Sequence, residues 1–274
     1  FYPEILEKLS TSLQQRGYHV LVFMAQQTAG NIDDVLEEIL DYQVDGIVLA
    51  SVAMSSVLAE RCDAAGIPVV LFNRAQQEDR FSTVTSDNFA GGKALAEFLV
   101  AGGHRRIGYI AGWEGASTQR DREAGFCAGL AEHGHKLFAR GVGDFRTETA
   151  ANAARAMFSA SEFPDAVFVA NDHMAFAVIE ELRGNLGLRV PEDVSVVGYD
   201  DVQLSRWSSF DLTTVRQPSG EMVAETVAAL MAQIEDGETE PRRVKIDGPL
   251  VVRGSARRPA DWQANWKECD DERL

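Results

Sequence analysis

Cysteine is scarce in this sequence: the 274 residues include three, Cys62, Cys127 and Cys269, which are far apart and odd in number. That pattern argues against a disulfide framework and favours a reducing, cytoplasmic compartment. No two cysteines form a C-x-x-C pair, so zinc or thiol redox chemistry has no motif to rest on. We therefore expect neither a metal site nor a cofactor.

Long apolar runs and a targeting signal are also missing. No apolar run approaches the ~20 residues that a membrane-spanning helix needs, so we expect no membrane association. Residues 1–4 show no basic region followed by an apolar one, as a signal peptide would. Because the chain also lacks an initiator methionine, the removal of such a peptide stays open at this stage.

Basic charge is low relative to acidic charge. The chain has 26 Lys and Arg against 42 Asp and Glu, which gives a formal net charge of -16. Such a surface repels a phosphate backbone, and we expect that this chain does not bind DNA by itself. A parent protein that binds DNA would need a separate basic module.

Helical and strand patterns alternate along almost the whole chain. Apolar spacing predicts helices over 4–16, 32–43, 55–65, 89–101, 118–134, 147–159, 173–185 and from Pro218 to about Glu235. Short apolar runs predict strands over 18–24, 46–50, 67–72, 106–111, 166–170, 194–198, 213–215, 243–247 and 249–253. Continuous apolar strands separated by helices indicate parallel sheets covered on both faces. The two series of βαβ units predict an α/β protein with two doubly wound, Rossmann-like lobes.

The two ends of the chain depart from this pattern. The chain opens in a helix, whereas a doubly wound lobe normally begins with a central strand. We therefore expect that the sequence is cut from a longer protein or that a first strand is missing. At the other end, residues 263–274 are polar and are expected to form a tail.

Polar and aromatic residues follow the predicted strands where those strands end. They are Ser51, Asn73, Arg74, Asp87, Asn88, Trp113, Phe145, Asn171, Asp172, Asp200 and Asp201. In open parallel sheets, ligands bind beyond the carboxyl ends of the strands. Carboxylates and amides that share hydroxyl hydrogen bonds, with aromatic rings for apolar C–H faces, suit a polyhydroxylated ligand.

Several of these residues also have purely structural interpretations. Asp172 could cap the helix that follows it, which would leave Asn171 free as a ligand donor, and Asp87 or Asn88 could likewise be only an N-cap. One member of the Asp200–Asp201 pair is expected to make turn or capping hydrogen bonds. The aromatic residues Trp113 and Phe145 could simply pack in the core or at a hinge.

The sequence contains no complete catalytic motif among those we considered. Residues 91–94 resemble the end of a phosphate loop, but the first glycine and the final Ser or Thr are replaced. Neither a G-x-G-x-x-G after a strand nor a G-x-S-x-G elbow or H-E-x-x-H pair occurs. His133 and His135 are typical of an exposed turn, and His104 of a capping turn. We therefore expect a protein that is not an enzyme.

The order of several short segments is more specific than any one of them. These are residues 1–5, 44–48, 67–70, 87–92, 103–107, 122–126, 169–175, 188–201 and 212–218. The strongest is Leu-Arg-Val-Pro-Glu-Asp-Val-Ser-Val-Val-Gly-Tyr-Asp-Asp, residues 188–201. In these segments, and over nearly its whole length, the chain resembles the LacI/GalR family of bacterial transcription regulators.

The resemblance implies a periplasmic binding protein type I-like core whose two lobes are joined by three crossovers. It places residues 1–86 with 217–247 in the N-terminal lobe and 87–216 with 248–262 in the C-terminal lobe. Such proteins bind a small-molecule effector between the lobes and work as dimers. They bind operator DNA through an N-terminal headpiece, which is absent from this chain, so operator DNA is a partner of the parent protein.

The resemblance also implies site residues, position by position. Arg122 matches the arginine of the family's cleft, and Phe145 falls where relatives place an aromatic ring over the ligand. The remaining matches are Asn171, Asp200, Phe1 in the first lobe, and Asp87. Where some relatives carry a second arginine for an anionic ligand, this chain has Ala116, which favours a neutral sugar.

Two other classes of protein remain to be weighed. A periplasmic sugar-binding protein of a transporter shares this architecture, but the block at residues 191–201, the lack of a visible signal and the unpaired cysteines favour the regulator. An α/β enzyme would need a nucleophile, a phosphate loop or a metal set. The sequence therefore predicts the effector-binding and dimerisation core of a LacI-type regulator.

Overall fold

The computed structural model describes residues 1–24, 35, 39, 41–51, 56–75 and 80–260. The chain divides into two compact units: unit 1 contains Phe1–Ser86 and Pro218–Ile246, and unit 2 contains Asp87–Gln217 and the chain from Asp247 onward. The sequence analysis assigned Gln217 and Asp247 to the first lobe, whereas both belong to unit 2. The side-chain amide of Gln217 donates to Asp200, which ties this residue to unit 2.

Unit 1 is built on a parallel sheet with helices on both faces. The strands are β1 (Ile47–Ala50), β2 (Val69–Phe72), β3 (Ser82–Ser86) and β9 (Arg243–Ile246), in the order β1-β2-β3-β9. The helices are α1 (Tyr2–Gln14), α3 (Ser56–Ala65) and α8 (Ser219–Glu235). Along β2, Val70 and Phe72 pack with α1 and α8, and Val69 and Leu71 pack with α3. This alternation is that of a strand buried on both faces.

Unit 2 contains a six-stranded sheet. Its strands are β4 (Ile107–Ala111), β5 (Ala139–Val142), β6 (Ala166–Val169), β7 (Ser195–Asp200), β8 (Thr213–Arg216) and β10 (Leu250–Val251). The order is β10-β8-β7-β6-β4-β5, and every neighbouring pair is parallel except β10 with β8. The prediction of an α/β protein with parallel sheets is confirmed, with an antiparallel edge strand that the sequence did not indicate.

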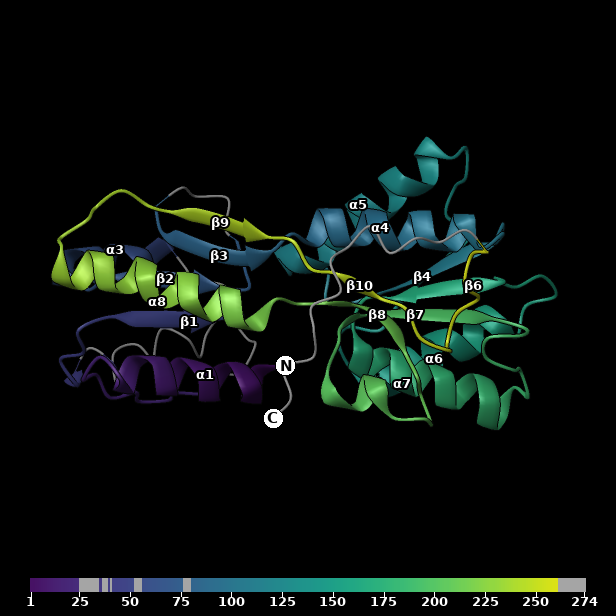
Figure 1. Ribbon diagram of the computed structural model, residues 1–274, viewed down its shortest axis with the longest axis horizontal. Coiled ribbons are helices and arrows are strands. Elements are labelled where there is room, and N and C mark those ends of the chain that lie inside the picture. The colour runs from purple at the N-terminus through teal and green to yellow at the C-terminus, as the bar shows by residue number, and fades with distance from the viewer. Residues whose placement is uncertain (25–34, 36–38, 40, 52–55, 76–79, 261–274) are drawn as a thin grey trace. The chain divides into compact units, whose positions relative to one another are not determined.

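Four helices cover the two faces of this sheet. They are α4 (Asn88–Ala101), α5 (Ser117–Glu132), α6 (Thr147–Phe158) and α7 (Asp172–Glu180), which continues as a π-helical turn over Glu181–Asn185. Figure 1 shows α4 and α5 on one face and α6 and α7 on the other. Tyr109, Phe126 and Phe168 form a buried aromatic cluster, with ring centroids 5.0–5.8 Å apart.

One strand expected from the sequence does not form, and two other expected segments cannot be compared with the structure. Residues 18–24 are described but join no strand, and Leu21, Val22 and Met24 are exposed. A strand forms when the backbone N–H and C=O groups of a segment pair with those of a neighbouring strand. Residues 18–24 pair with none of the strands of the unit 1 sheet, whose order is β1-β2-β3-β9. Most of the helix expected over 32–43, and the polar tail at 263–274, lie outside the described residues.

Two strands were missed because their sequences do not look like buried strands. β3 consists of Ser and Thr residues around one valine, although it is buried throughout. β5 lies at the edge of its sheet and alternates half-buried with exposed residues. Neither gives the continuous apolar run by which the other parallel strands were found.

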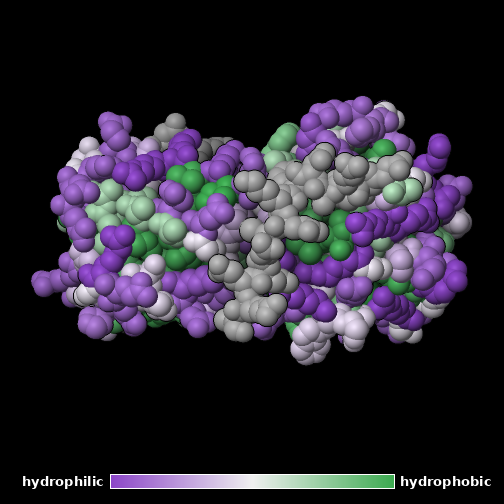
Figure 2. Space-filling view, in the orientation of Figure 1, coloured by the Kyte–Doolittle hydropathy of each residue, from purple (hydrophilic) through white to green (hydrophobic). Residues whose placement is uncertain are grey.

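In Figure 2, hydrophilic residues dominate the face in view, and hydrophobic residues form small groups. Among the described residues, no helix combines the length and apolar character needed to cross a membrane.

Candidate functional site

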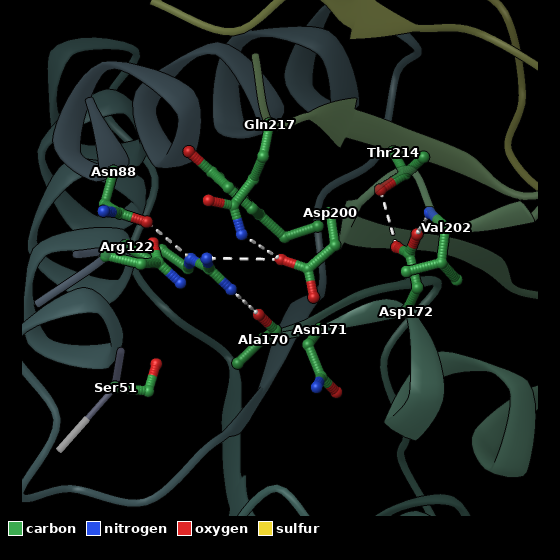
Figure 3. A network of polar contacts seen from close by, with 12 residues as sticks. Ser51, Asn88, Arg122, Ala170, Asn171, Asp172, Asp200, Val202, Thr214 and Gln217 are labelled. Carbon is green, nitrogen blue, oxygen red and sulfur yellow. Dashed lines mark hydrogen bonds and ion pairs between the residues drawn. The ribbon is translucent and has the colours of Figure 1, made fainter. Parts of the chain in front are cut away.

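Arg122, on α5, is the centre of a buried polar network in unit 2, and its side chain is 3% exposed. Its Nε donates to Asn88 Oδ1 at 2.8 Å, and its Nη1 donates to the carbonyl oxygen of Ala170 at 2.6 Å. Its Nη2 lies 3.4 Å from Asp200 Oδ1 (Figure 3). The guanidinium carbon also lies 3.7 Å from the centre of the Tyr199 ring. A planar guanidinium held from so many sides has one orientation.

Two glycines allow the helix of Arg122 to approach α4. A Cβ atom on Gly92 would lie 2.2 Å from the carbonyl oxygen of Arg122, and one on Gly125 would lie 2.0 Å from that of Phe89. Both contacts involve backbone, so neither could be relieved by moving a side chain. The close approach of the two helices is what brings Asn88 within reach of Arg122.

Asp200 ends β7 and faces this network, with a side chain that is 10% exposed. Its Oδ1 accepts a hydrogen bond from Gln217 Nε2 at 2.7 Å besides facing Arg122. The backbone N–H of Gln217 also donates to the carbonyl oxygen of Asp200, at 3.3 Å. Gln217 Oε1 is buried and accepts no hydrogen bond within the described residues. Gln217 thus fixes both the backbone and the carboxylate of Asp200.

Asn171 and Asp172 exchange the roles that the sequence suggested. Asn171 is the N-cap of α7, and its Oδ1 accepts from the N–H of Met174 at 3.0 Å. Asp172 does not cap the helix. Its carboxylate is fully buried and accepts from Thr214 Oγ1 at 2.6 Å, Ser205 Oγ at 2.7 Å and the Val202 N–H at 3.0 Å.

The environment of Asp172 disfavours its charged form. Burial, together with the neighbouring charge of Asp200, raises the pKa of Asp172 to about 7, although its three hydrogen bonds act in the opposite direction. Two carboxylates therefore lie near each other in different states of solvation. Asp200 faces the guanidinium of Arg122, whereas Asp172 is satisfied by uncharged donors.

Asp201 is the structural member of the Asp200–Asp201 pair. Its buried carboxylate makes ion pairs of 2.6 Å with both Arg216 and Arg253. These contacts join the end of β7 to β8 and to the segment after β10. One role for each aspartate is what the sequence analysis expected, and the structure shows which aspartate takes which.

The other predicted site residues of unit 2 have identifiable local contacts. Asp87 is the N-cap of α4, and its Oδ1 accepts from the N–H of Ala90 at 2.9 Å. Phe145 has a φ of 56° and packs its half-buried ring against Gly112, where a Cβ atom would lie 2.2 Å from the ring. The ring of Trp113 covers Gly115 in the same way.

Phe1 lies in unit 1, apart in the chain from the other five predicted residues. Its ring stacks on Phe72, with centroids 6.4 Å apart, and meets the ring of Tyr2 edge-on. The Tyr2 hydroxyl is hydrogen-bonded to Ser51 Oγ and accepts from Asn73 Nδ2 at 2.9 Å. Unit 1 therefore carries its own aromatic and polar group at the carboxyl ends of β1 and β2.

The structure brings Arg122 and Asp200 into direct contact, and it adds residues that the sequence analysis did not propose as a site. Gln217 follows the end of β8, so the rule that found the other polar residues could have found it. Tyr199 gave no such signal, because it lies inside an apolar strand. No group of three or more His, Cys, Asp or Glu that could hold a metal ion occurs in the part of the chain that the structure describes.

Comparison with known proteins agrees with this architecture. Residues 96–256 match the family of periplasmic binding protein-like domains. The chain is 35% identical over 263 residues to the HTH-type transcriptional regulator CelR of Thermobifida fusca, which covers 93% of this chain and 76% of CelR. It is 31% identical over 266 residues to the transcriptional repressor PurR of Photorhabdus laumondii, covering 92% and 78%.

Solved structures of transcriptional regulators also resemble this chain. The complex of the transcriptional regulator CelR with cellobiose has a TM-score of 0.85 at 32% identity, covering 93% of this chain and 79% of that one. A LacI transcriptional regulator from a Rhodococcus species has a TM-score of 0.84 at 26% identity, covering 94% of both chains.

The fold is thus that of a periplasmic binding protein-like domain. Among proteins of this class, the chain belongs to the LacI/GalR family of transcriptional regulators and corresponds to their effector-binding core. The relatives named above are regulators of transcription, not enzymes.

Proposed function

We propose that this core binds a neutral sugar and that the sugar controls operator binding by a dimeric parent protein. The observation that carries the proposal is the buried pair of Arg122 and Asp200, held by Asn88, Tyr199 and Gln217. A fixed guanidinium donates to hydroxyl oxygens and a fixed carboxylate accepts from hydroxyl groups. Together they match neighbouring hydroxyls of a sugar ring.

Two further observations favour a neutral sugar. The residue that precedes α5 is Ala116, which is buried and uncharged, so it offers nothing to an anionic group. In addition, the relative CelR has been solved with cellobiose bound. Phe145 and Phe1 would supply the apolar contacts, and Asn171 and Asp87 would supply further polar ones.

The regulatory step follows from linkage. A ligand shifts an equilibrium only through different affinities for the two states. A sugar that binds one conformation of this core more tightly would favour that conformation, and in a dimer it would change the spacing of the DNA-binding headpieces. The acidic charge of this chain is consistent with a separate basic headpiece.

The first experiment is a thermal-shift screen of the chain against cellobiose, glucose, other neutral sugars and sugar acids. A ligand that binds the folded state raises the melting temperature by mass action. We expect a neutral sugar to give the largest shift. No shift with any neutral sugar, or a shift with sugar acids alone, would overturn the sugar assignment.

The second experiment tests the site by calorimetry with the best sugar of that screen. Arg122→Ala removes the donors of a charged group, and Asp200→Asn removes the negative charge of an acceptor, so we expect affinity to fall by at least about tenfold in each variant. Arg120→Ala is the matched control, because Arg120 is on the same helix but exposed, and its Nη1 donates to the backbone carbonyl oxygens of Glu114 and Gly115. Unchanged affinity in both site variants would place the ligand elsewhere.

A further inference from the structure

Asp172 is a buried carboxylate that is not among the residues proposed to contact the ligand. It is fully buried, and its three hydrogen-bond donors come from different segments: Thr214 on β8, Ser205 in the 3-10 turn Gln203–Arg206, and the backbone of Val202. All three donors are uncharged. Removing a carboxylate from water is costly, and three neutral donors offset only part of that cost.

The backbone segment just before Val202, whose N–H is hydrogen-bonded to Asp172, is in an uncommon conformation. Asp200 has a φ of 123° and Asp201 a φ of 53°, both in the region that favours glycine. Residues with side chains stay there only when surrounding contacts hold them. The N–H of Val202, which directly follows this pair, donates to Asp172 Oδ2. Asp172 therefore anchors the turn that carries Asp200.

The sheet makes room for this contact. Gly198 lies on β7 two residues before Asp200, and a Cβ atom there would lie 2.4 Å from Asp172 Oδ1. Any other residue at position 198 would displace the carboxylate from Thr214. Figure 3 shows Asp200 directed to Arg122 and Asp172 directed to Thr214 and Val202.

We propose that Asp172 is a positioning residue that holds the Asp200–Asp201 turn so that Asp200 meets Arg122 and the ligand. The effect of Asp172 on ligand affinity rests on the proposed function, whereas its effect on the conformation of the Asp200–Asp201 turn does not. Asp172 itself would not touch the sugar. Its acceptor atoms, aimed at the Val202 N–H, would fix where the Asp200 carboxylate lies.

Two substitutions at position 172 test whether the hydrogen-bond acceptors of its side chain hold the turn. Asp172→Ala removes every acceptor and leaves the Val202 N–H without its partner. In Asp172→Asn the amide oxygen can accept from Val202 and Ser205, while the amide nitrogen donates to Thr214 Oγ1, which can also accept. The asparagine variant should therefore keep the turn in place.

The ligand-free readout is hydrogen exchange of the Val202 amide and of peptides that span residues 199–205. In Asp172→Ala we expect exchange to accelerate by at least about tenfold, because a buried hydrogen bond is lost. In Asp172→Asn it should stay within about threefold of the original chain. Asp193→Ala is the control, since Asp193 also accepts a backbone N–H, that of Arg189, but lies away from this turn.

The ligand readout is calorimetry with cellobiose, or with the sugar found by the screen. We expect the alanine variant to lose at least about tenfold in affinity and the asparagine variant to keep it. Unchanged Val202 exchange in Asp172→Ala, or equal losses in both variants, would overturn the positioning role. Absence of sugar binding by the original chain would overturn the proposed function alone, because the exchange experiment needs no ligand.

If Asp172→Ala does not fold, Thr214→Val replaces it. This change removes one donor to the Asp172 carboxylate at nearly constant volume. Thr226→Val is its match, because Thr226 is equally buried and its hydroxyl donates to a carbonyl oxygen within α8. Faster exchange over 199–205 in Thr214→Val but not in Thr226→Val supports the proposal, and equal exchange in the two overturns it.

Discussion

The guanidinium carbon of Arg122 lies over the ring of Tyr199, 3.7 Å from its centre, while the carboxylate of the next residue, Asp200, lies 3.4 Å from Nη2 of the same guanidinium. Neighbouring residues of a strand ordinarily point to opposite faces of the sheet. The φ of 123° at Asp200 ends this alternation. The last two residues of β7 can therefore contact one arginine on α5.

Tyr199→Leu should weaken ligand binding by about tenfold, whereas Tyr199→Phe should leave it nearly unchanged. A buried cation–π contact contributes about 1–2 kcal/mol, and only the leucine variant loses the ring. The phenylalanine variant keeps the ring and removes only the hydroxyl group, whose hydrogen bond to the carbonyl oxygen of Asp87 is 3.5 Å long. Calorimetry with the best sugar measures the effect. Equal losses in the two variants would show that the ring is not what orients Arg122.

Gly92→Ala should destabilise the protein by about 1–3 kcal/mol, which is typical of overpacking. The new Cβ atom would meet the carbonyl oxygen of Arg122 at 2.2 Å, so α4 and α5 must separate. Gly220→Ala in α8 is the control, because a Cβ atom there meets nothing within 4 Å, and alanine favours a helix by up to about 1 kcal/mol. Urea unfolding of both variants measures the two effects. A stability of Gly92→Ala equal to that of the original chain would contradict the close helix contact.

Much of the fold could be predicted because its strands are apolar runs bounded by turn residues. The exceptions show where that rule ends. The buried strand β3 is made of Ser and Thr residues around Val84; it lies inside the sheet between β2 and β9, and Val84 packs with residues of α1 and α8. Conversely, residues 18–24 have the composition of a strand and join no sheet. A sequence window contains no information about the neighbours that decide such cases.

The candidate site was predictable in part for the same reason. The rule that ligands lie beyond strand ends found Asp200, whereas Arg122, on a helix, was found only through the family resemblance. The exchange of roles between Asn171 and Asp172 could not be predicted. Both residue types cap helices, and the donors that hold Asp172 lie 30 to 42 positions further along the chain.

The two neighbouring aspartates should give opposite results when they are changed. Asp201→Ala leaves Arg216 and Arg253 without their shared partner, and breaking a buried ion pair costs about 3–5 kcal/mol. Asp200→Asn keeps a hydrogen-bond acceptor, so its main effect should be on sugar affinity. Urea unfolding and calorimetry on both variants measure the contrast. A larger stability loss in Asp200→Asn than in Asp201→Ala would reverse the assignment.

The stability of this protein should depend on pH through Asp172. Burial and the charge of Asp200 raise the pKa of Asp172 from 3.8 to about 7. Between these values the folded protein keeps a proton that the unfolded chain releases. The contribution of Asp172 is thus fully present below pH 3.8 and is lost as the pH rises through about 7.

Asp172→Asn removes this titration, because its amide stays neutral. Relative to the original chain, the variant should gain about 2 kcal/mol of unfolding free energy between pH 5 and pH 8. Urea unfolding at four pH values across that range measures the difference. Asp193→Asn is the control, since its ion pair with Arg189 lowers the pKa of Asp193 to about 2, below the range tested. A constant difference between Asp172→Asn and the original chain would mean that Asp172 is already charged at pH 5, and that its three hydrogen bonds outweigh its burial.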